Sequence, residues 1–278
     1  MRCKPGPTEG TENGMNDVPS ARPYHPPPPA AMPSPAAPKP ARKTAGRPIN
    51  STITRERIVE VALAQIDRVG IHAFSLRDVA RSLDVYPSTI YWHLASKEAL
   101  LAEVSNLVMA GVVPPRGDGD WRAWMRKLFS RYRKSVRKHP NVAQLLGAQL
   151  ASNGALSVEL IEGVIDALLE AGATEANLRE AYNCVIAALM GFMTMELAPL
   201  PADDPEGWAA ALEGRVRSVD ALAHPTLARH LPLLANRAFI LRWQNGSDVP
   251  LNSSFDAHIE IFLAGLDAFL RGKTPTAG

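Results

Sequence analysis

The chain has 278 residues, of which 46% are hydrophobic, 21% charged and 6% aromatic. This length accommodates about two domains, and this composition excludes a wholly disordered, collagenous or coiled-coil protein. Because no run of 18 apolar residues occurs, we expect no membrane-spanning helix. Two cysteines, Cys3 and Cys184, are too few for a disulfide framework or a zinc cluster, and the N-terminus lacks the apolar core of a secretory signal. We therefore expect a cytoplasmic protein.

Positive charge is concentrated near the N-terminus, although the net charge of the chain is only +2. Residues 1–48 carry seven Lys/Arg and three Asp/Glu, and Lys39, Arg42, Lys43 and Arg47 lie close together. The same segment holds 13 of the 24 prolines, so we expect it to be disordered. A basic arm before a folded domain suits contact with a polyanion. A proline-rich ligand for a partner, a dispensable leader and a start codon assigned too early are the alternatives.

Four short helices are expected after this arm, at residues 54–69, 75–83, 87–94 and 97–110. Thr54 and Ser75 are suitable N-terminal caps, Gly70 can end the first helix, and Pro87 suits the first turn of the third. A three-residue turn beginning at Asp84 separates the second and third helices, which is the plan of a helix-turn-helix unit.

The chain stays helical beyond this unit. We expect helices near residues 121–138, 141–151, 157–171, 175–197, 206–222, 225–243 and 254–271. No alternating strand pattern competes with them, so the predicted fold class is all-α. The stretch 121–138 carries eight Lys/Arg and no acid, which predicts a solvated face or, alternatively, a second nucleic-acid surface.

The third helix has an unusual outward face. Ile90 and Leu94 point inward, so helical geometry turns Ser88 and Trp92 outward and places Tyr91 beside them. Hydroxyl groups and aromatic edges can contact phosphates, base edges and thymine methyl groups. Packing of the aromatic side chains against the rest of the chain is the alternative. Residues 49–100 carry six Lys/Arg and six Asp/Glu, so affinity for DNA would depend on the basic arm and on two copies.

Several segments together resemble the tetracycline-repressor (TetR) family over about 55 residues: Arg47-Pro48, Ile58-x-x-x-Ala62, Gly70, Phe74-Ser75-Leu76-Arg77-Asp78-Val79-Ala80, Leu83-x-Val85, Thr89-Ile90-Tyr91-Trp92-His93 and Lys97-Glu98-Ala99-Leu100-Leu101. The resemblance implies a homodimeric, ligand-responsive transcriptional regulator. Its N-terminal three-helix domain would insert the third helix into the DNA major groove, and a bridging helix would join it to a larger helical domain for dimerisation and effector binding.

The same resemblance assigns DNA contacts to Ser75, Leu76, Arg77, Pro87, Ser88, Thr89, Tyr91 and His93, and a phosphate contact to Lys97. The outward face adds Trp92, the basic arm adds Arg47, and the amides that begin the fourth helix offer one more phosphate site. The chain departs from the family in having Asp84 where a turn glycine is usual and Pro87 where a base-reading residue is common. Asp tolerates the left-handed conformation, so we expect the turn to persist.

The C-terminal half resembles the corresponding family domain more loosely, through Trp121, Arg137-Lys138-His139-Pro140, Gly191-Phe192 and Phe255-Asp256-x-x-x-Glu260-x-x-Leu263. Helices 175–197 and 254–271 are expected to pair with their copies as a four-helix bundle. An apolar effector cavity is predicted to be lined by Asn183, Met190, Met193, Thr194 and Trp243. Ordinary core and dimer packing is the alternative for each of these residues.

The predicted organisation is a leader (1–48), a helix-turn-helix DNA-binding domain (49–100) and an effector-binding and dimerisation domain (101–278). The favoured hypothesis is a repressor released from a palindromic operator by a small apolar effector. The alternative is an architectural or nucleoid-associated DNA-binding protein without an effector. The chain has no nucleophile elbow, phosphate loop, zinc-ligand spacing or cofactor fingerprint, so no catalytic residue, metal or cofactor is expected.

Overall fold

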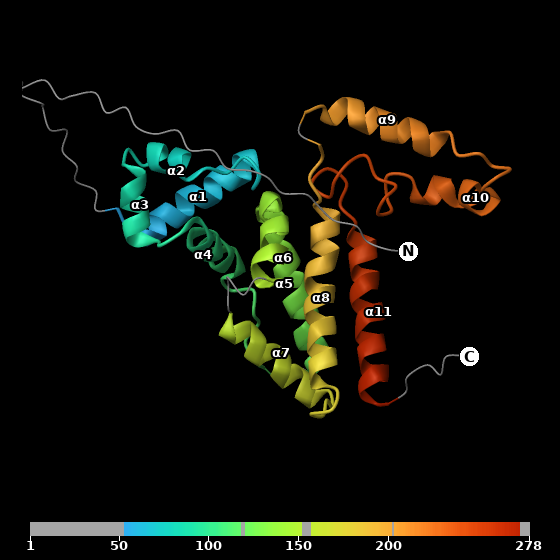
Figure 1. Cartoon of the computed structure of the whole chain (residues 1–278). Coiled ribbons are helices and arrows are strands. Elements are labelled where there is room, and N and C mark those ends of the chain that lie inside the picture. Colours follow the sequence, from blue (N-terminus) through green and yellow to red (C-terminus); the bar gives the residue numbers. More distant parts are fainter. Residues whose placement is uncertain (1–52, 118–119, 152–156, 202, 273–278) are drawn as a thin grey trace, which may run out of the picture. The chain divides into compact units, whose positions relative to one another are not determined.

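The computed structural model describes residues 53–117, 120–151, 157–201 and 203–272. Within these ranges the chain is all-α, with eleven α-helices, one short 3₁₀ helix and no strand (Figure 1). The helices are α1 (Arg55–Val69), α2 (Leu76–Ser82), α3 (Pro87–His93), α4 (Lys97–Met109), α5 (Trp121–Lys138), η1 (Pro140–Val142), α6 (Ala143–Ala151), α7 (Val158–Glu170), α8 (Leu178–Glu196), α9 (Pro205–Arg217), α10 (Pro225–Leu234) and α11 (Asn252–Leu270). In the described ranges no helix is both long and apolar enough to cross a lipid bilayer.

The first three helices pack around a small apolar core, and α4 packs against α1. Ile58 and Ile66 of α1 are completely buried in this core. The ends of α1 are as predicted: the Thr54 hydroxyl accepts a hydrogen bond from the Arg57 amide at 3.2 Å, and the Gly70 amide donates to the Ile66 carbonyl at 2.8 Å. We call α1, α2 and α3 the head.

The larger part of the fold is built on α5, whose bounds are those predicted from the sequence. Its apolar stripe, which includes Leu128, Tyr132 and Val136, is buried against α7, α8 and α11. Helix α8 in turn packs against α6, α7 and α11. Figure 1 shows α8 and α11 running side by side. The head joins this part through α4, which contacts α5 and α6 as well as α1.

The basic residues of α5 are mostly structural. Four of its arginines bind acids on other helices: Arg122 binds Asp267, Arg126 binds Glu260, and both Arg133 and Arg137 bind Glu196. A fifth, Arg131, donates to carbonyl groups at residues 111 and 113, at 3.4 and 3.3 Å. The predicted solvated face is confirmed for Arg126 and Arg131, which are exposed, but the arginines of α5 also tie it to α8, α11 and the chain before α5. The alternative of a second nucleic-acid surface stays a prediction.

Helix α10 ends at Leu234, so the prediction of a helix over 225–243 was wrong in its second half. Pro232 lies inside the last turn, and Asn236 adopts a left-handed φ of 57°. The Asn236 side-chain oxygen then accepts hydrogen bonds from the amides of Trp243 at 3.2 Å and Gln244 at 3.1 Å. A side chain that bonds backbone groups further along the chain competes with helix formation, which explains the early end.

The segment after α10 returns to the C-terminal end of α8. The Gly246 amide donates to the Glu196 carbonyl at 2.7 Å. A Cβ atom at position 246 would lie 2.8 Å from that carbonyl oxygen and 2.3 Å from the Glu196 Cγ, so this approach requires glycine. Residues 51–278 together form one compact unit, and the division into a DNA-binding and an effector domain remains a prediction.

Candidate nucleic-acid interface

The turn between α2 and α3 fixes how α3 is presented. Asp84 adopts the left-handed conformation, with a φ of 56°, which confirms that aspartate can replace the usual glycine here. The Val85 amide donates to the Ala80 carbonyl at 3.0 Å and closes the turn. Pro87 occupies the first turn of α3, where its missing N–H costs nothing. The chain therefore starts α3 in a defined direction relative to α2, with which it is in contact.

The inner face of α3 holds it against the head. Ile90 is 1% exposed and Leu94, directly after the helix, is 3% exposed. Both belong to the same buried cluster as Val79 of α2 and Ile58 of α1. The inward orientation predicted from helical spacing is confirmed.

The outer face of α3 presents aromatic and hydroxyl groups. Trp92 is 83% exposed and Tyr91 is 50% exposed. Ser88 is exposed, whereas Thr89 and His93 are half-buried. The rings of Trp92 and His93 meet edge to face, with centroids 4.8 Å apart, so one side chain supports the other. The chain leaves Trp92 largely uncovered, contrary to the packing alternative, and covers about half of Tyr91.

Tyr86 belongs to the same region but was missed in the reading of the sequence. It lies at the N-terminal cap of α3 and is 81% exposed. The signal that indicates it is its position directly before Pro87, where the chain enters the helix at the surface. We add Tyr86 to the candidate interface.

The start of α2 contributes polar groups beside α3. Ser75 occupies the predicted N-terminal cap of α2, but its side chain makes no capping hydrogen bond. Arg77 is exposed, and Leu76 is half-buried and packs against the head core. Arg81 forms an ion pair with Asp78 one turn earlier in the helix.

The start of α4 is less available to a phosphate than expected. The Ser96 hydroxyl accepts a hydrogen bond from the Ala99 amide at 3.1 Å. The Glu98 carboxyl accepts hydrogen bonds from its own backbone N–H and from Ser96, and these lower its pKa. A second amide is therefore already paired, and a negative charge already lies at this end of the helix. Lys97 is half-buried, with its ammonium 5.4 Å from the centre of the Phe74 ring. The phosphate site predicted from free amides is therefore partly filled by the chain itself.

Arg47, the contact predicted in the basic arm, lies outside the described residues. The structure does bring the other predicted DNA-contacting residues to the head and the start of α4: Ser75, Leu76, Arg77, Pro87, Ser88, Thr89, Tyr91, Trp92, His93 and Lys97. A helix-turn-helix with an exposed polar and aromatic face on its second helix suits insertion into a DNA groove.

The predicted effector-binding residues are spread over α8 and the segment after α10. Met190 and Met193 are buried, Asn183 is exposed, and the Thr194 hydroxyl donates to the Met190 carbonyl at 3.0 Å. Trp243 is half-buried in the returning segment. Their predicted role as a cavity lining stays a prediction.

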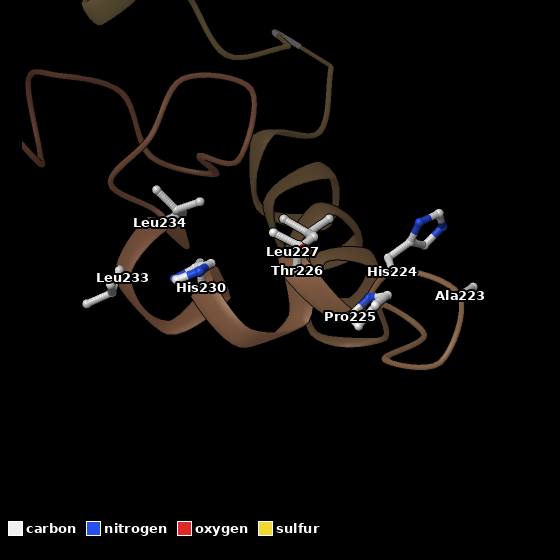
Figure 2. A pocket seen from close by; sticks show the side chains of 8 residues that line it. All are labelled: Ala223, His224, Pro225, Thr226, Leu227, His230, Leu233 and Leu234. Carbon is white, nitrogen blue, oxygen red and sulfur yellow. The ribbon is translucent and has the colours of Figure 1, made fainter.

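A separate open cavity lies beside α10, as Figure 2 shows. His224 and His230 both line it but lie apart along the helix, with Leu227, Leu233 and Leu234 on the same surface. In the described part of the chain no group of three or more His, Cys, Asp or Glu side chains could hold a metal ion. Helix α10 contributes no buried residue, so its side chains form an open surface.

Two family models match the chain. One, described as bacterial regulatory proteins of the tetR family, matches residues 58–104, and the other, a tetracyclin repressor-like C-terminal domain, matches residues 113–270. An HTH-type transcriptional regulator of Saccharopolyspora erythraea is 27% identical over 196 residues, which cover 70% of this chain and 80% of that protein. The class C tetracycline repressor of Escherichia coli is 22% identical over 218 residues, 77% of this chain and 91% of that protein.

One solved structure with a similar fold was determined in complex with DNA. The crystal structure of BioQ with its natural double-stranded DNA operator is 26% identical, with a TM-score of 0.50, and the match covers 64% of this chain and 98% of that chain. The helix-turn-helix, the larger helical part and these matches agree with one another. The C-terminal family model alone matches more than half of this chain. The chain therefore belongs to the tetR family of DNA-binding transcriptional regulators.

Proposed function

We propose that this protein is a repressor that binds a palindromic operator as a homodimer and is released from it by a small apolar effector. The observation that carries the proposal is the exposed face of α3, where Trp92 is 83% and Tyr91 50% exposed while Ile90 on the opposite side is buried. Large aromatic groups on a soluble surface favour a binding role. The similar class C tetracycline repressor supports the choice of repressor over activator.

In this proposal α3 lies in the major groove and the start of α2 lies on the backbone. Ser88, Thr89 and Tyr91 face base edges and thymine methyl groups, because hydroxyl and aromatic groups suit those contacts. Positioning contacts to phosphate and sugar come from the remaining residues of the interface: Arg47, Ser75, Leu76, Arg77, Tyr86, Pro87, Trp92, His93 and Lys97. Two heads then read half-sites about 34–36 Å apart.

The dimer is proposed to form through α8 and α11. Their exposed sides carry small or apolar residues, among them Ala187 and Gly191 on α8, and Ile261 and Gly265 on α11. Ile261 is 74% exposed. A Cβ atom at either glycine would meet no other atom within 4 Å, so a second helix has room to approach. Two copies of this pair make an isologous four-helix bundle.

Helix α4 is proposed to couple effector binding to the position of the head, since it packs against α1 of the head and against α5 and α6. Met190, Met193, Thr194, Asn183 and Trp243 remain the proposed effector contacts. The dimer is proposed to exist in an operator-binding form and a released form. An effector that shifts their ratio from 99:1 to 1:99 must bind the released form about 10⁴-fold more tightly than the operator-binding form. We place this switch in the cytoplasm and assign no reaction to the chain. If no compound alters operator binding, the alternative applies, in which the protein is an architectural DNA-binding protein without an effector.

Replacement of Tyr91 by alanine tests the DNA contact. Genomic fragments selected with the full chain supply the operator, and Tyr91→Ala should lower affinity for it at least about tenfold, since a base contact contributes about 1–3 kcal/mol. Tyr91→Phe keeps the ring and separates the contribution of the hydroxyl. Light scattering should show the same dimer mass for both variants, because Tyr91 lies on the head, outside the buried core and away from the proposed dimer helices α8 and α11. Unchanged operator affinity in Tyr91→Ala would refute this assignment of α3.

A further inference from the structure

A cavity of about 310 Å³ lies beside α9, away from the head. Its apolar walls come from the end of α8, from α9 and from the returning segment, through Met195, Leu200, Trp208, Leu212 and Phe239. We call this space the α9 cavity. Its volume lies at the lower end of the roughly 300–1,000 Å³ typical of small-molecule sites. Only Thr194 and Trp243 of the predicted effector contacts are sequence neighbours of its lining, and none of the five lines it.

One side of the α9 cavity is polar and short of hydrogen-bond acceptors. Arg242, which lines it, is 9% exposed. A guanidinium has five N–H donors. Those of Arg242 donate to the Val249 carbonyl at 2.7 Å and, at 3.5 Å, to the Glu196 carbonyl, while its Nε has no partner among the described residues. Arg242 thus lines the cavity with N–H donors left over, and an acceptor atom brought in by a ligand would be stabilised by those that face it.

The charges around Arg242 favour an anion. The Glu196 carboxylate is completely buried, but it already receives Arg133 at 2.7 Å, Arg137 at 3.5 Å and the Leu251 amide at 2.8 Å. Two guanidinium groups thus already bind this carboxylate, and the third, that of Arg242, reaches only the Glu196 backbone carbonyl. Burial lowers the pKa of Arg242, which shows that its charge is held at a cost in desolvation. A negative group in the cavity would offset that cost.

The mouth of the cavity carries backbone strain. Ile240, which lines it, has a left-handed φ of 72°. This conformation is unfavourable for a β-branched side chain, and such residues gather at ligand clamps and switch regions. Ile240 is also 88% exposed, so a large apolar side chain is held at the opening without a covering group.

We propose that the α9 cavity binds a small aromatic compound that carries an anionic oxygen group, such as a carboxylate or sulfonate. The aromatic body lies between Trp208 and Phe239, and the anionic group lies at Arg242. Phe239 also contacts Phe192 edge to face, with centroids 5.3 Å apart, so the cavity wall continues into the core of α8. This site does not depend on the proposed operator binding, because none of its residues belongs to the head.

Two fluorescent probes with the same aromatic body test the proposal on the full chain. They are 8-anilinonaphthalene-1-sulfonate and the uncharged N-phenyl-1-naphthylamine. We expect the sulfonate to bind saturably, once per chain. Arg242→Gln should weaken the sulfonate about tenfold, since a charge-assisted hydrogen bond contributes about 1.5–3 kcal/mol, and leave the neutral probe within about twofold.

A second variant keeps the test decisive if Arg242→Gln does not fold. Leu212→Trp fills the cavity from α9, leaves Arg242 in place and should weaken both probes. Leu233→Ser, at a 72% exposed position on α10, is the control for probe bound to open apolar surface and should change neither affinity. Sulfonate affinity that survives Leu212→Trp, or that is lost in Leu233→Ser, overturns the proposal. So does an equal loss of both probes in folded Arg242→Gln.

Discussion

Tyr132 shows how the burial of one polar side chain links the stability of the fold to pH. It is 1% exposed, and its hydroxyl donates to the Met190 sulfur at 3.3 Å. Burial raises the pKa of Tyr132, because the phenolate would lose its hydration. An unfolded tyrosine ionises near pH 10. The contribution of Tyr132 to the free energy of unfolding is therefore fully present below about pH 10. It is lost as the pH rises above about 10, because the unfolded tyrosine then ionises while the native hydroxyl stays protonated.

We accordingly expect the free energy of unfolding to fall by about 1.4 kcal/mol per pH unit above about pH 10, from this residue alone. Urea denaturation of the chain and of Tyr132→Phe at about pH 8 and pH 11 measures it. The difference between the two proteins should change by roughly that slope, since phenylalanine does not titrate. Parallel curves for the chain and Tyr132→Phe would contradict the expectation.

At the scale of elements, the periodicity of apolar residues located most helices because each buries one stripe. Helix α5 was predicted to the residue, since its stripe is continuous and its first residue follows the N-terminal cap Asp120. Helix α10 was predicted too long. No buried stripe constrains α10, and its end depends on hydrogen bonds from Asn236 to residues seven and eight positions further along, which local patterns do not reveal.

The same distinction applies to the candidate interface. The buried and exposed faces of α3 follow from helical spacing, so Ile90 and Trp92 were placed correctly. The cap of α4 could also be predicted from the sequence, since Ser96 directly precedes the helix and its hydroxyl accepts a hydrogen bond from the Ala99 amide. The predicted phosphate site at these amides did not allow for this cap. The α9 cavity could not be predicted at all, since it is formed by segments that meet only in the folded chain.

A second prediction concerns the junction between the head and η1. The Asn141 side-chain amide donates to the carbonyls of Ile66 at 3.3 Å and Asp67 at 2.9 Å. The last carbonyls of a helix lack partners within it, so Asn141 satisfies groups at the end of α1. Beside it, His139 Nδ1 lies 2.8 Å from the Asp67 carboxylate. The end of α1 is thereby fixed to the larger part of the fold.

Asn141→Ala should lower the free energy of unfolding by about 1–3 kcal/mol, because it leaves the Asp67 carbonyl without this donor, while the Ile66 carbonyl keeps the Gly70 amide. Urea denaturation gives the size of the loss, and amide hydrogen exchange should show faster exchange at the end of α1 than at the centre of α5. Asn252→Ala, at an exposed asparagine in α11, is the matched control and should be nearly neutral. If Asn141→Ala is as neutral as the control, these two hydrogen bonds do not hold the head.

For the whole molecule, the distribution of charge decides how DNA is held. The head carries no net charge over residues 49–100, and several arginines of α5 are engaged with acids on α8 and α11. Affinity for a phosphate backbone depends on cations that remain available to it. The proposed operator complex must therefore gain much of its electrostatic attraction from the basic arm, whose cluster is Lys39, Arg42, Lys43 and Arg47.

The salt dependence of operator binding tests this contribution of the arm. Each phosphate contact contributes about 0.9 to the slope of log K against log salt concentration. Replacing the four cations of the cluster by glutamine should flatten the slope by up to about 3.6 per chain and weaken binding at low salt. Deletion of residues 1–37, which keeps the cluster, is the matched control and should leave the slope nearly unchanged. If the deletion flattens the slope as much as the glutamine variant does, the attraction comes from elsewhere in the leader; if neither changes it, the head binds phosphates without the arm.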